Sequence, residues 1–357
     1  MDAAARAPGR VIVIVLVYRG ADIAIECLSS VLASDYPDFR IIALDNASPD
    51  GAYKQIEAWA SGAAAPPAIL QSPIGAQANF AGPIDFAERA PGDEPRDSAS
   101  LPRVTLVQTG ANLGYAGGNN VALRWLENMR DWDYAWVLNP DTVIASDTMR
   151  ALAAKCAGNP SLGAVGARIA DYREPSRILE WGGAQYRAWR GTGRLLGHGH
   201  LTSEPVDEAR IAQDLSWVSG ASLFFTREFL RRAGPMDDSY FLYFEEADWC
   251  LRRGSLKLGY AHDARVYHRL GSSIGSSTSY RQRSAFSIGW SLRNRFRFAR
   301  KFHASALPLI YLSSYIDIAR MLMAGAFANA WLEFCLINGL KRFPEPPAKT
   351  GRVPEAG

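Results

Sequence analysis

The chain has 357 residues, of which 48% are hydrophobic and 21% are charged, a composition typical of a globular protein with a substantial core. Its formal net charge of +3 is close to neutral, so no global basic field indicates a nucleic-acid partner. The four cysteines are far apart and form no Cys-x-x-Cys pair, which argues against a disulfide framework or a zinc knuckle and favours reduced cytosolic thiols.

The start of the chain alternates between strand and helix patterns. Residues 1–10 lack the charged-then-apolar form of a signal peptide, so we expect the main domain to face the cytosol. Val11–Val17 are apolar on both faces, which is typical of a fully buried parallel strand. A helix over Ile23–Leu32 and a second buried strand over Ile41–Leu44 follow. The pattern predicts a β–α–β unit with parallel strands and a right-handed crossover.

The segment 61–100 interrupts this alternation. It is rich in Ala, Pro, Gly and acidic residues and has no sustained period, so we expect a surface insertion. Strands are predicted again over Val104–Val107 and Tyr134–Leu138, with a Gly-rich turn and a helix between them. The second of these strands runs directly into Asn139-Pro140-Asp141.

The second half has fewer clear elements. We expect a strand over Trp217–Phe225, a helix over Glu245–Arg253 and a last strand over Ala264–His268. The predicted architecture is one α/β sheet domain over residues 1–277, with mixed strands in its second half.

Polar residues follow three of the predicted strands. They are Asp45-Asn46, the Gly-rich turn Asn112–Asn120, and Asn139–Asp141. Ligands of open α/β sheets bind beyond the carboxyl ends of the strands. Each segment has a purely local interpretation, as an Asx turn, a tight glycine turn or a helix cap. Their shared position at successive strand ends favours a ligand site.

A cluster of carboxylates stands in the second half, at Glu245, Glu246 and Asp248. Like charges in an aromatic setting raise one another's pKa and prepare a carboxylate to take a proton. The acidic first turn of a helix explains the cluster equally well. His268 alone is more typical of a structural histidine, but together with Asp141 it offers an imidazole and a carboxylate for a divalent ion.

Taken together, these segments resemble the family 2 glycosyltransferases, and within them the bacterial rhamnosyltransferase and galactofuranosyltransferase branch. The segments that carry the resemblance, in order, are Val11–Val17, Leu44–Ser48, Asn112–Asn120, Leu138–Asp141, Ser219–Ala221, Glu245–Asp248 and Val266–His268. The resemblance implies the GT-A fold with its Rossmann-like nucleotide-binding sheet, a nucleotide-sugar donor, Mg²⁺ or Mn²⁺, and inversion at the anomeric carbon.

The resemblance also implies a role for each matching residue. Asp45 would contact the nucleoside, Tyr18 would lie near the base, and the other residues of the nucleotide pocket would be Asn46, Asn112, Gly114, Asn119 and Asn139. Asp141 and His268 would be the metal ligands, and Glu246 would be the catalytic base, flanked by Glu245 and Asp248.

Two residues depart from the family pattern. Asn139 replaces the first Asp of an Asp-x-Asp element, which removes one anionic ligand. Glu246 replaces the usual Asp at the base position, and its longer side chain leaves Glu245 and Asp248 as alternative bases.

The end of the chain is predicted to be a helical appendage over residues 278–341, followed by a loose tail over 342–357. Residues 280–303 are basic and helical in pattern, whereas 304–340 are apolar but interrupted by Asp317, Arg320 and Glu333. We therefore expect no uninterrupted run of ~20 apolar residues that could span a bilayer. The appendage is expected to lie in the cytoplasmic membrane interface, or else to pack on the domain or form a homo-oligomer.

The expected function is sugar transfer from dTDP-rhamnose or a UDP-sugar to a glycan or polyprenyl-linked acceptor in cell-envelope polysaccharide synthesis, at the inner face of the membrane. The alternatives are a sugar-phosphate nucleotidyltransferase and a non-catalytic nucleotide- or glycan-binding relative. Tyr18-Arg19-Gly20 is a poor match to the signature of the first, and the presence of Asp141, Glu246 and His268 together speaks against the second.

Overall fold

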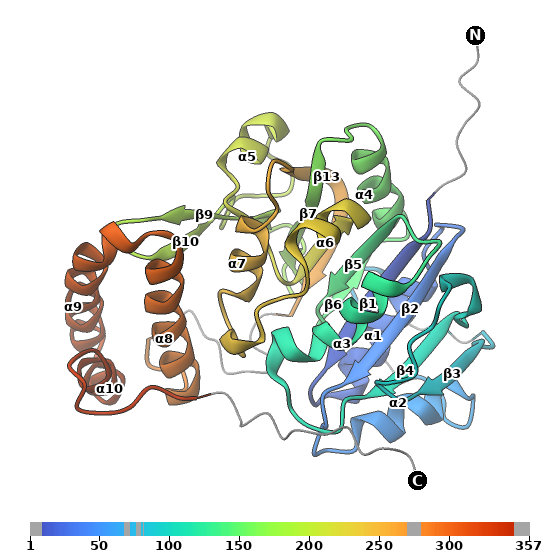
Figure 1. The fold of residues 1–357 in the computed structure, drawn as a ribbon, viewed down its shortest axis with the longest axis horizontal. Helices are drawn as coiled ribbons and strands as arrows, with labels where there is room; N and C mark the ends of the chain where they lie inside the picture. The colour runs from blue at the N-terminus through green and yellow to red at the C-terminus, as the bar shows by residue number, and fades with distance from the viewer. Residues whose placement is uncertain (1–8, 68–71, 76–79, 81, 270–279, 346–357) are drawn as a thin grey trace.

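The computed structural model describes residues 9–67, 72–75, 80, 82–269 and 280–345. The boundary predicted near residue 277 and all but the first four residues of the predicted tail lie outside this part of the chain. Within it, a ten-stranded sheet carries helices on both faces, and a group of three helices lies at the end opposite the β3 edge (Figure 1).

The first half confirms the predicted parallel sheet. Its elements are β1 (Val11–Val17), α1 (Ala21–Leu32), β2 (Phe39–Asp45), α2 (Ala52–Ala60), β3 (Phe86–Arg89), a 3₁₀ turn (Ser98–Ser100), β4 (Val104–Gln108), α3 (Gly114–Asn128), β5 (Tyr134–Leu138), β6 (Thr142–Ile144) and α4 (Thr148–Ala157). Strand β1 pairs in parallel with β2 on one side and β5 on the other, and β4 pairs in parallel with β2. The carboxyl ends of these strands therefore meet at one edge of the sheet.

The segment 61–100 contributes more than a surface insertion. Its residues Phe86–Arg89 form β3, which pairs in parallel with β4 at the outer edge of the sheet. This strand was not predicted, because four residues are too few to show a period and two of them, Glu88 and Arg89, are charged. Charged side chains are common on edge strands, where they discourage pairing with another chain.

The second half is mixed, as predicted. Its elements are β7 (Leu162–Asp171), β8 (Ile178–Trp181), β9 (Gly183–Arg187), β10 (Thr192–Leu195), α5 (Glu208–Asp214), β11 (Trp217–Val218), β12 (Ser222–Thr226), α6 (Arg227–Ala233), a 3₁₀ turn (Asp238–Tyr240), α7 (Glu245–Leu251) and β13 (Lys257–His268). Strand β12 is antiparallel to both β5 and β7, whereas β13 is parallel to β7. The strand-like run Trp217–Phe225 divides at Ser219–Ala221, so that β11 joins a small sheet with β9 and β10.

Two hydrophobic clusters cover the two faces of the sheet. The alternating side chains of β1 belong to both: Ile12 and Ile14 pack with α3 on one face, and Val13 and Val15 pack with α1 on the other. Strands that are buried on both faces read as continuous apolar runs, which is why β1 was recognisable from the sequence.

The C-terminal helices are α8 (Ala285–Phe302), α9 (Leu307–Met323) and α10 (Phe327–Ile337), with a 3₁₀ turn (Ala304–Ala306) after α8. Helix α8 belongs to the main domain, because Phe298 is fully buried in its core and lies 5.4 Å from Phe244 and 5.1 Å from Tyr186 between ring centroids. Helices α9 and α10 pack on its other side around a small core of their own. Helix α8 therefore packs with the main domain, although the predicted appendage included it.

The appendage was expected to lack an uninterrupted apolar run, and Asp317 and Arg320 do interrupt α9, yet one stretch is long and apolar enough to span a bilayer by length and composition. Ala304–Met323 is 20 residues long with a mean hydropathy of 1.2, and within the described residues it is the one helix that passes this test of length and composition. A third of the helix (33%) is nevertheless buried against the rest of the protein.

Candidate functional site

A cavity of about 290 Å³ lies beyond the carboxyl ends of β1, β2 and β5. Six of the residues predicted for the site line it, namely Tyr18, Asn46, Asn112, Gly114, Asn139 and Asp141. Its other walls include Arg19, Tyr115, Phe241, Leu242, Ser284 and Phe286. The three polar strand-end segments thus meet at one place, as their positions in the sequence predicted.

Asn46 acts as a link between two of these segments. Its Oδ1 accepts a hydrogen bond from the backbone N–H of Leu113 (3.0 Å), and its Nδ2 donates to Asn112 Oδ1 (3.0 Å). The turn that it holds requires glycine at position 114, where φ is +72° and a Cβ would lie 2.4 Å from the carbonyl oxygen of Phe241. The amide of Asn46 therefore shapes the wall of the cavity that Asn46 lines, and its contact with a nucleotide stays a prediction.

Asp45 and Asn119 lie behind the cavity and do not line it. Asp45 Oδ2 accepts from the backbone N–H of Ser48 (3.2 Å), which is the local turn considered as its alternative role. Asn119 Nδ2 donates to the carbonyl of Tyr115 (3.0 Å). The Oδ1 atoms of both residues are buried without a hydrogen-bond partner in the described part of the chain. The structure does not place either residue in contact with the cavity where a nucleotide would lie.

Asp141 and His268 come together across two strands. Antiparallel pairing of β13 with β6 sets His268 opposite Thr142, and His268 Nε2 lies 3.1 Å from Asp141 Oδ1. Burial alone would lower the pKa of His268, but the Asp141 carboxylate and its hydrogen bond raise this pKa above the ordinary value. The Nδ1 atom of His268 is buried and, among the described residues, has no hydrogen-bond partner.

Asp141 and His268 fit a site for a divalent cation whose remaining ligands would come from the bound substrate. No group of three or more His, Cys, Asp or Glu side chains in the described residues is placed to hold a metal by itself. Mg²⁺ is commonly held by one or two protein carboxylates, with substrate phosphates and water completing its shell, and Mn²⁺ accepts oxygen and imidazole ligands. Asp141 at the cavity wall, with the imidazole of His268 beside it, suits that arrangement.

Glu245 and Glu246 begin helix α7 on the far side of Tyr115. The Tyr115 hydroxyl donates to the carbonyl of Gly220 (2.6 Å), and a Cβ on Gly220 would lie 3.8 Å from Cγ of Glu246. Burial, together with a smaller effect of the nearby charge of Glu180, raises the pKa of Glu246 to about 7. Burial and the adjacent Glu246 raise the pKa of Glu245 well above its usual range. A carboxyl group that titrates near neutrality is suited to general-base catalysis.

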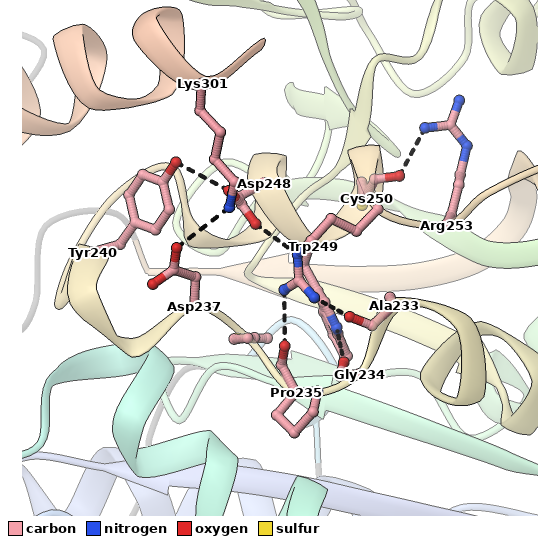
Figure 2. A network of polar contacts seen from close by, with 12 residues as sticks. Ala233, Gly234, Pro235, Asp237, Tyr240, Asp248, Trp249, Cys250, Arg253 and Lys301 are labelled. Atoms are coloured by element: carbon pink, nitrogen blue, oxygen red, sulfur yellow. Dashed lines mark hydrogen bonds and ion pairs between the residues drawn. The ribbon is translucent and has the colours of Figure 1, made fainter.

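Asp248 does not belong to this site. Its carboxylate is fully buried and accepts from Tyr240 (3.1 Å), Arg252 Nε (2.7 Å) and Lys301 Nζ (2.5 Å). Figure 2 shows this carboxylate between Tyr240 and Lys301, with Asp237 also reaching Lys301. These three partners hold the carboxylate inside the protein, and it does not line the cavity, so the structure gives no support to Asp248 as a base. The Asp248 carboxylate instead attaches α7 to α8 through Lys301.

The loop before Glu245 is strained and is held by the same helix. Phe241, Tyr243 and Phe244 have φ of +60°, +71° and +73°, a conformation that costs free energy in residues other than glycine. Asn294 of α8 donates to the carbonyl oxygens of Tyr240 and Leu242, both at 2.7 Å. Helix α8 thereby fixes the segment that carries two cavity residues and leads into the two glutamates.

One further carboxylate near the site was not predicted. Glu180 lies on β8, where burial raises its pKa while a hydrogen bond from Ser219 opposes the shift. Its charge and that of His268 affect one another's pKa values, so the two residues are neighbours. The sequence feature that could have indicated Glu180 is its position as a lone glutamate within the apolar run Ile178–Trp181. The aromatic cavity residues Phe241 and Phe286 had no comparable signal, because their position depends on how α8 packs.

Comparisons with known proteins show which family the chain is similar to. Residues 12–70 match the model of glycosyl transferase family 2. The low-salt glycan biosynthesis hexosyltransferase Agl10 of Haloferax volcanii is 26% identical over 209 residues, which are 57% of this chain and 62% of that protein. The N-acetylglucosaminyl-diphospho-decaprenol L-rhamnosyltransferase of Mycobacterium tuberculosis is 29% identical over 199 residues, 49% of this chain and 61% of that protein. The chain spans about three fifths of the length of these curated relatives.

A solved structure supports the fold. GalNAc-T7, crystallised with UDP, GalNAc and Mn²⁺, superimposes with a TM-score of 0.56 over 97% of this chain and 59% of its own, at 12% identity. At that identity the likeness concerns the fold alone. The partial family match and the two relatives show that the chain is similar to family 2 glycosyltransferases, and the superposition supports the GT-A fold.

Proposed function

We propose that the protein is an inverting glycosyltransferase that moves a sugar from a nucleotide-diphosphate donor to a hydroxyl group of a glycan or lipid-linked acceptor in cell-envelope polysaccharide synthesis. The observation that carries the proposal is the arrangement around the cavity, where Asp141 lines the wall with His268 beside it, and Glu246 lies near Tyr115, which lines the cavity elsewhere. One relative is named as a rhamnosyltransferase that acts on a decaprenol-linked diphosphate, which supports dTDP-rhamnose as the first donor to test and a UDP-sugar as the second.

The donor would lie in the 290 Å³ cavity, with its base near Tyr18 and its diphosphate toward Asn139 and Asp141. Mg²⁺ or Mn²⁺ held by Asp141 and His268 would neutralise the charge that develops on the diphosphate leaving group. Asn139 contributes an uncharged amide oxygen, so Asp141 provides the anionic ligand of this element.

Glu246 would take the proton of the attacking hydroxyl. An alcohol has a pKa far above neutrality, so its proton must leave as the new bond forms, and a base with a pKa near 7 suits that transfer. Glu245, with its pKa raised further, would remain protonated and add no second negative charge. Attack from the face opposite the leaving diphosphate inverts the anomeric carbon, and holding donor and acceptor in line lowers the barrier further.

The proposal is tested with a panel of nucleotides and nucleotide sugars. We expect UDP-sugars or dTDP-rhamnose to raise the melting temperature of the protein, and Mn²⁺ to increase that rise. Free nucleoside diphosphate should then appear when an acceptor is added. Thermal stabilisation without any release of nucleoside diphosphate would identify a binding protein instead of an enzyme. No stabilisation by any member of the panel would contradict the proposal altogether.

We further propose that α9 and α10 lie on the inner face of the cell membrane. Leu309, Leu312, Ile316 and Met323 form an exposed apolar stripe on α9, and Met323 is 82% exposed. On α10, Phe327 and Trp331 are 66% and 64% exposed. Exposed side chains of this size mark a surface that contacts a partner or a membrane. Basic residues flank the stripe, at Arg281, Arg320, Lys341 and Arg342.

The attachment of α9 to the protein favours an interfacial position. Asp317 in the middle of α9 pairs with Arg190 and with Arg295 (3.2 Å), which ties one side of the helix to the rest of the chain. Spanning the bilayer would require that these buried ion pairs be broken, at a cost of several kcal/mol. An amphipathic helix with its apolar side in the lipid needs no such change.

Replacing Leu312 and Trp331 together with Glu should abolish binding to vesicles that contain anionic lipid. Each substitution places a charge where an apolar side chain would enter the lipid. Vesicle flotation measures the effect, with Leu201→Glu as the control, since Leu201 is an exposed leucine (45%) outside the C-terminal helices. Wild-type protein that fails to float, or that forms a dimer which the double variant disrupts, would contradict the membrane proposal. Truncation before α8 is unsuitable, because Phe298 is part of the main core.

A further inference from the structure

A second cavity, of about 200 Å³, lies between α8, α9, α10 and the turn that joins β9 to β10. Its polar and aromatic lining consists mainly of Arg190, Phe244, Tyr280, Arg283, Asp317 and Glu333. Neighbouring residues of two segments line the two cavities. In one segment Leu242 lines the donor cavity and Phe244 the second cavity. In the other, Ser284 lines the donor cavity and Arg283 the second cavity. The two cavities therefore share a wall, and Glu245 follows directly from that wall.

Glu333 is the most unusual residue of this second cavity. It is 5% exposed, and it has no hydrogen bond or ion pair with any residue that the structure describes. Its pKa is raised from 4.5 to about 7, mainly by burial and also by the charge of Asp317, while Arg295 and Arg283 oppose the shift. Buried polar groups are usually paired, because leaving one unpaired costs stability. Glu333 is the kind of group that a ligand with hydroxyl donors would satisfy.

Cationic groups in the same cavity are also left unmatched. Arg190 and Arg295 both pair with Asp317, but Nε of Arg190 is buried without a hydrogen-bond partner in the described residues. The guanidinium of Arg283 has no hydrogen bond or ion pair to a described residue and is one of the charges that act on Glu333. The cavity thus presents an unpaired carboxylate together with unpaired N–H donors.

These groups favour one chemical class of ligand. A phosphate would be attracted by Arg283 but repelled by Glu333 when that carboxylate is ionised. An ammonium group would meet the opposite conflict. A sugar hydroxyl both donates and accepts, so neighbouring hydroxyls on one ring can satisfy a carboxylate and a guanidinium together. Phe244 and Tyr280 supply aromatic rings against which the apolar face of a sugar can pack. The volume is below the ~300–1,000 Å³ of drug-sized sites, which suits a single ring.

We infer that this cavity is an acceptor subsite that binds one sugar ring of the acceptor through Glu333 and Arg283. The inference rests on the proposed glycosyltransferase function and adds the class of group that the acceptor presents. The subsite lies on the other side of the shared wall from the donor and next to the exposed apolar side chains of α9 and α10. An acceptor glycan attached to a lipid would thus reach Glu246 from the direction of the proposed membrane face.

The test measures sugar binding by the full chain without donor. Saturation-transfer NMR titrations measure the binding. The probes are glucose, galactose, mannose, L-rhamnose, N-acetylglucosamine and N-acetylgalactosamine. We expect at least one probe to bind the wild type, and Glu333→Gln and Arg283→Gln each to weaken that binding at least tenfold. Arg300→Gln is the matched control, because Arg300 is an exposed arginine of α8, the helix that follows Arg283. Sugar binding by this variant should stay within twofold of the wild type.

Two results of this binding assay would overturn the inference. One is that no probe binds the wild type, and the other is that both variants bind the probes as the wild type does. Calorimetry of the same samples with UDP or dTDP and Mn²⁺ reports on the donor cavity separately. Failure of nucleotide binding there would contradict the proposed function, whereas failure of sugar binding alone would contradict only the acceptor subsite.

Thermal unfolding separates a ligand-binding Glu333 from a structural one. The unfolded chain loses the proton of Glu333 above pH 4.5, whereas the folded protein keeps it until about pH 7. The folded state therefore loses stability as pH rises from 4.5 to 7, and Glu333→Gln removes that loss. We expect the variant to melt at a higher temperature than the wild type at pH 8, with the difference shrinking toward pH 5. A lower melting temperature for the variant at pH 8 would show a structural role and would also overturn the inference.

Discussion

Replacing Glu246 with Gln is expected to reduce sugar transfer by about 10²–10⁴-fold, the usual contribution of a general base, while donor affinity stays within about twofold. Gln keeps the size of the side chain but cannot accept the proton of the attacking hydroxyl. Donor affinity should change little because Glu246 lies behind Tyr115 and does not line the donor cavity. Release of nucleoside diphosphate and of glycosylated product, measured together with calorimetric titration of the donor, gives both quantities.

Glu245→Gln is the matched control for this variant. Both residues start the same helix, and burial and the neighbouring Glu246 raise the pKa of Glu245 well above its usual range. Replacing a protonated carboxyl group by an amide should change the transfer rate far less than the Glu246 substitution does. If Glu245→Gln abolishes transfer while Glu246→Gln retains more than a few per cent, the base has been assigned to the wrong residue.

The pH dependence of the wild type provides a second check on Glu246. Its carboxyl group must be ionised to act as a base, and burial raises its pKa to about 7. The ratio kcat/KM should therefore rise with pH through about 7 and level off above it. A profile that is flat from pH 5 to 8 would mean that no group with this pKa limits the reaction.

Asp141→Asn is expected to weaken metal-dependent donor binding by at least about tenfold, since replacing even the hydrogen-bond partner of a metal ligand costs about 10–100-fold. Asn139 is already neutral, so the variant would leave the Asn139–Asp141 element without an anionic ligand. Calorimetric titration with UDP or dTDP, with and without Mn²⁺, measures the loss. The difference between the two conditions should be large in the wild type and nearly absent in the variant.

Asp147→Asn serves as the control for Asp141. Asp147 follows β6 in the same part of the chain, but its side chain is 49% exposed and pairs with Arg265 outside the cavity. Its replacement should leave nucleotide titration unchanged. Equal donor titrations for Asp141→Asn and the wild type in Mn²⁺ would remove Asp141 from the metal site.

Much of the fold was predictable because it depends on local patterns. Buried parallel strands are apolar on both faces, so β1, β2, β4 and β5 were visible as runs, and the polar segments after them had to meet at one edge of the sheet. Strand β3 was missed because four residues show no period. The placement of α8 in the main core was missed because an amphipathic helix does not specify which surface it covers.

By itself, the sequence determined the parallel sheet, the meeting of Asn112, Asn139 and Asp141 at its carboxyl edge, and the pairing of Asp141 with a later histidine. These follow from strand ends and from residue types. Only the tertiary structure distinguished Glu246 from Asp248. The two carboxylates are two positions apart on one helix, and what separates them is a lysine 53 residues beyond Asp248 that neutralises one and not the other. Glu333 was likewise read from the sequence as a polar interruption, since only the packing of α8, α9 and α10 reveals that it is buried without a partner. Charge is a property of the residue, but its pKa and its availability to a ligand depend on which distant groups surround it.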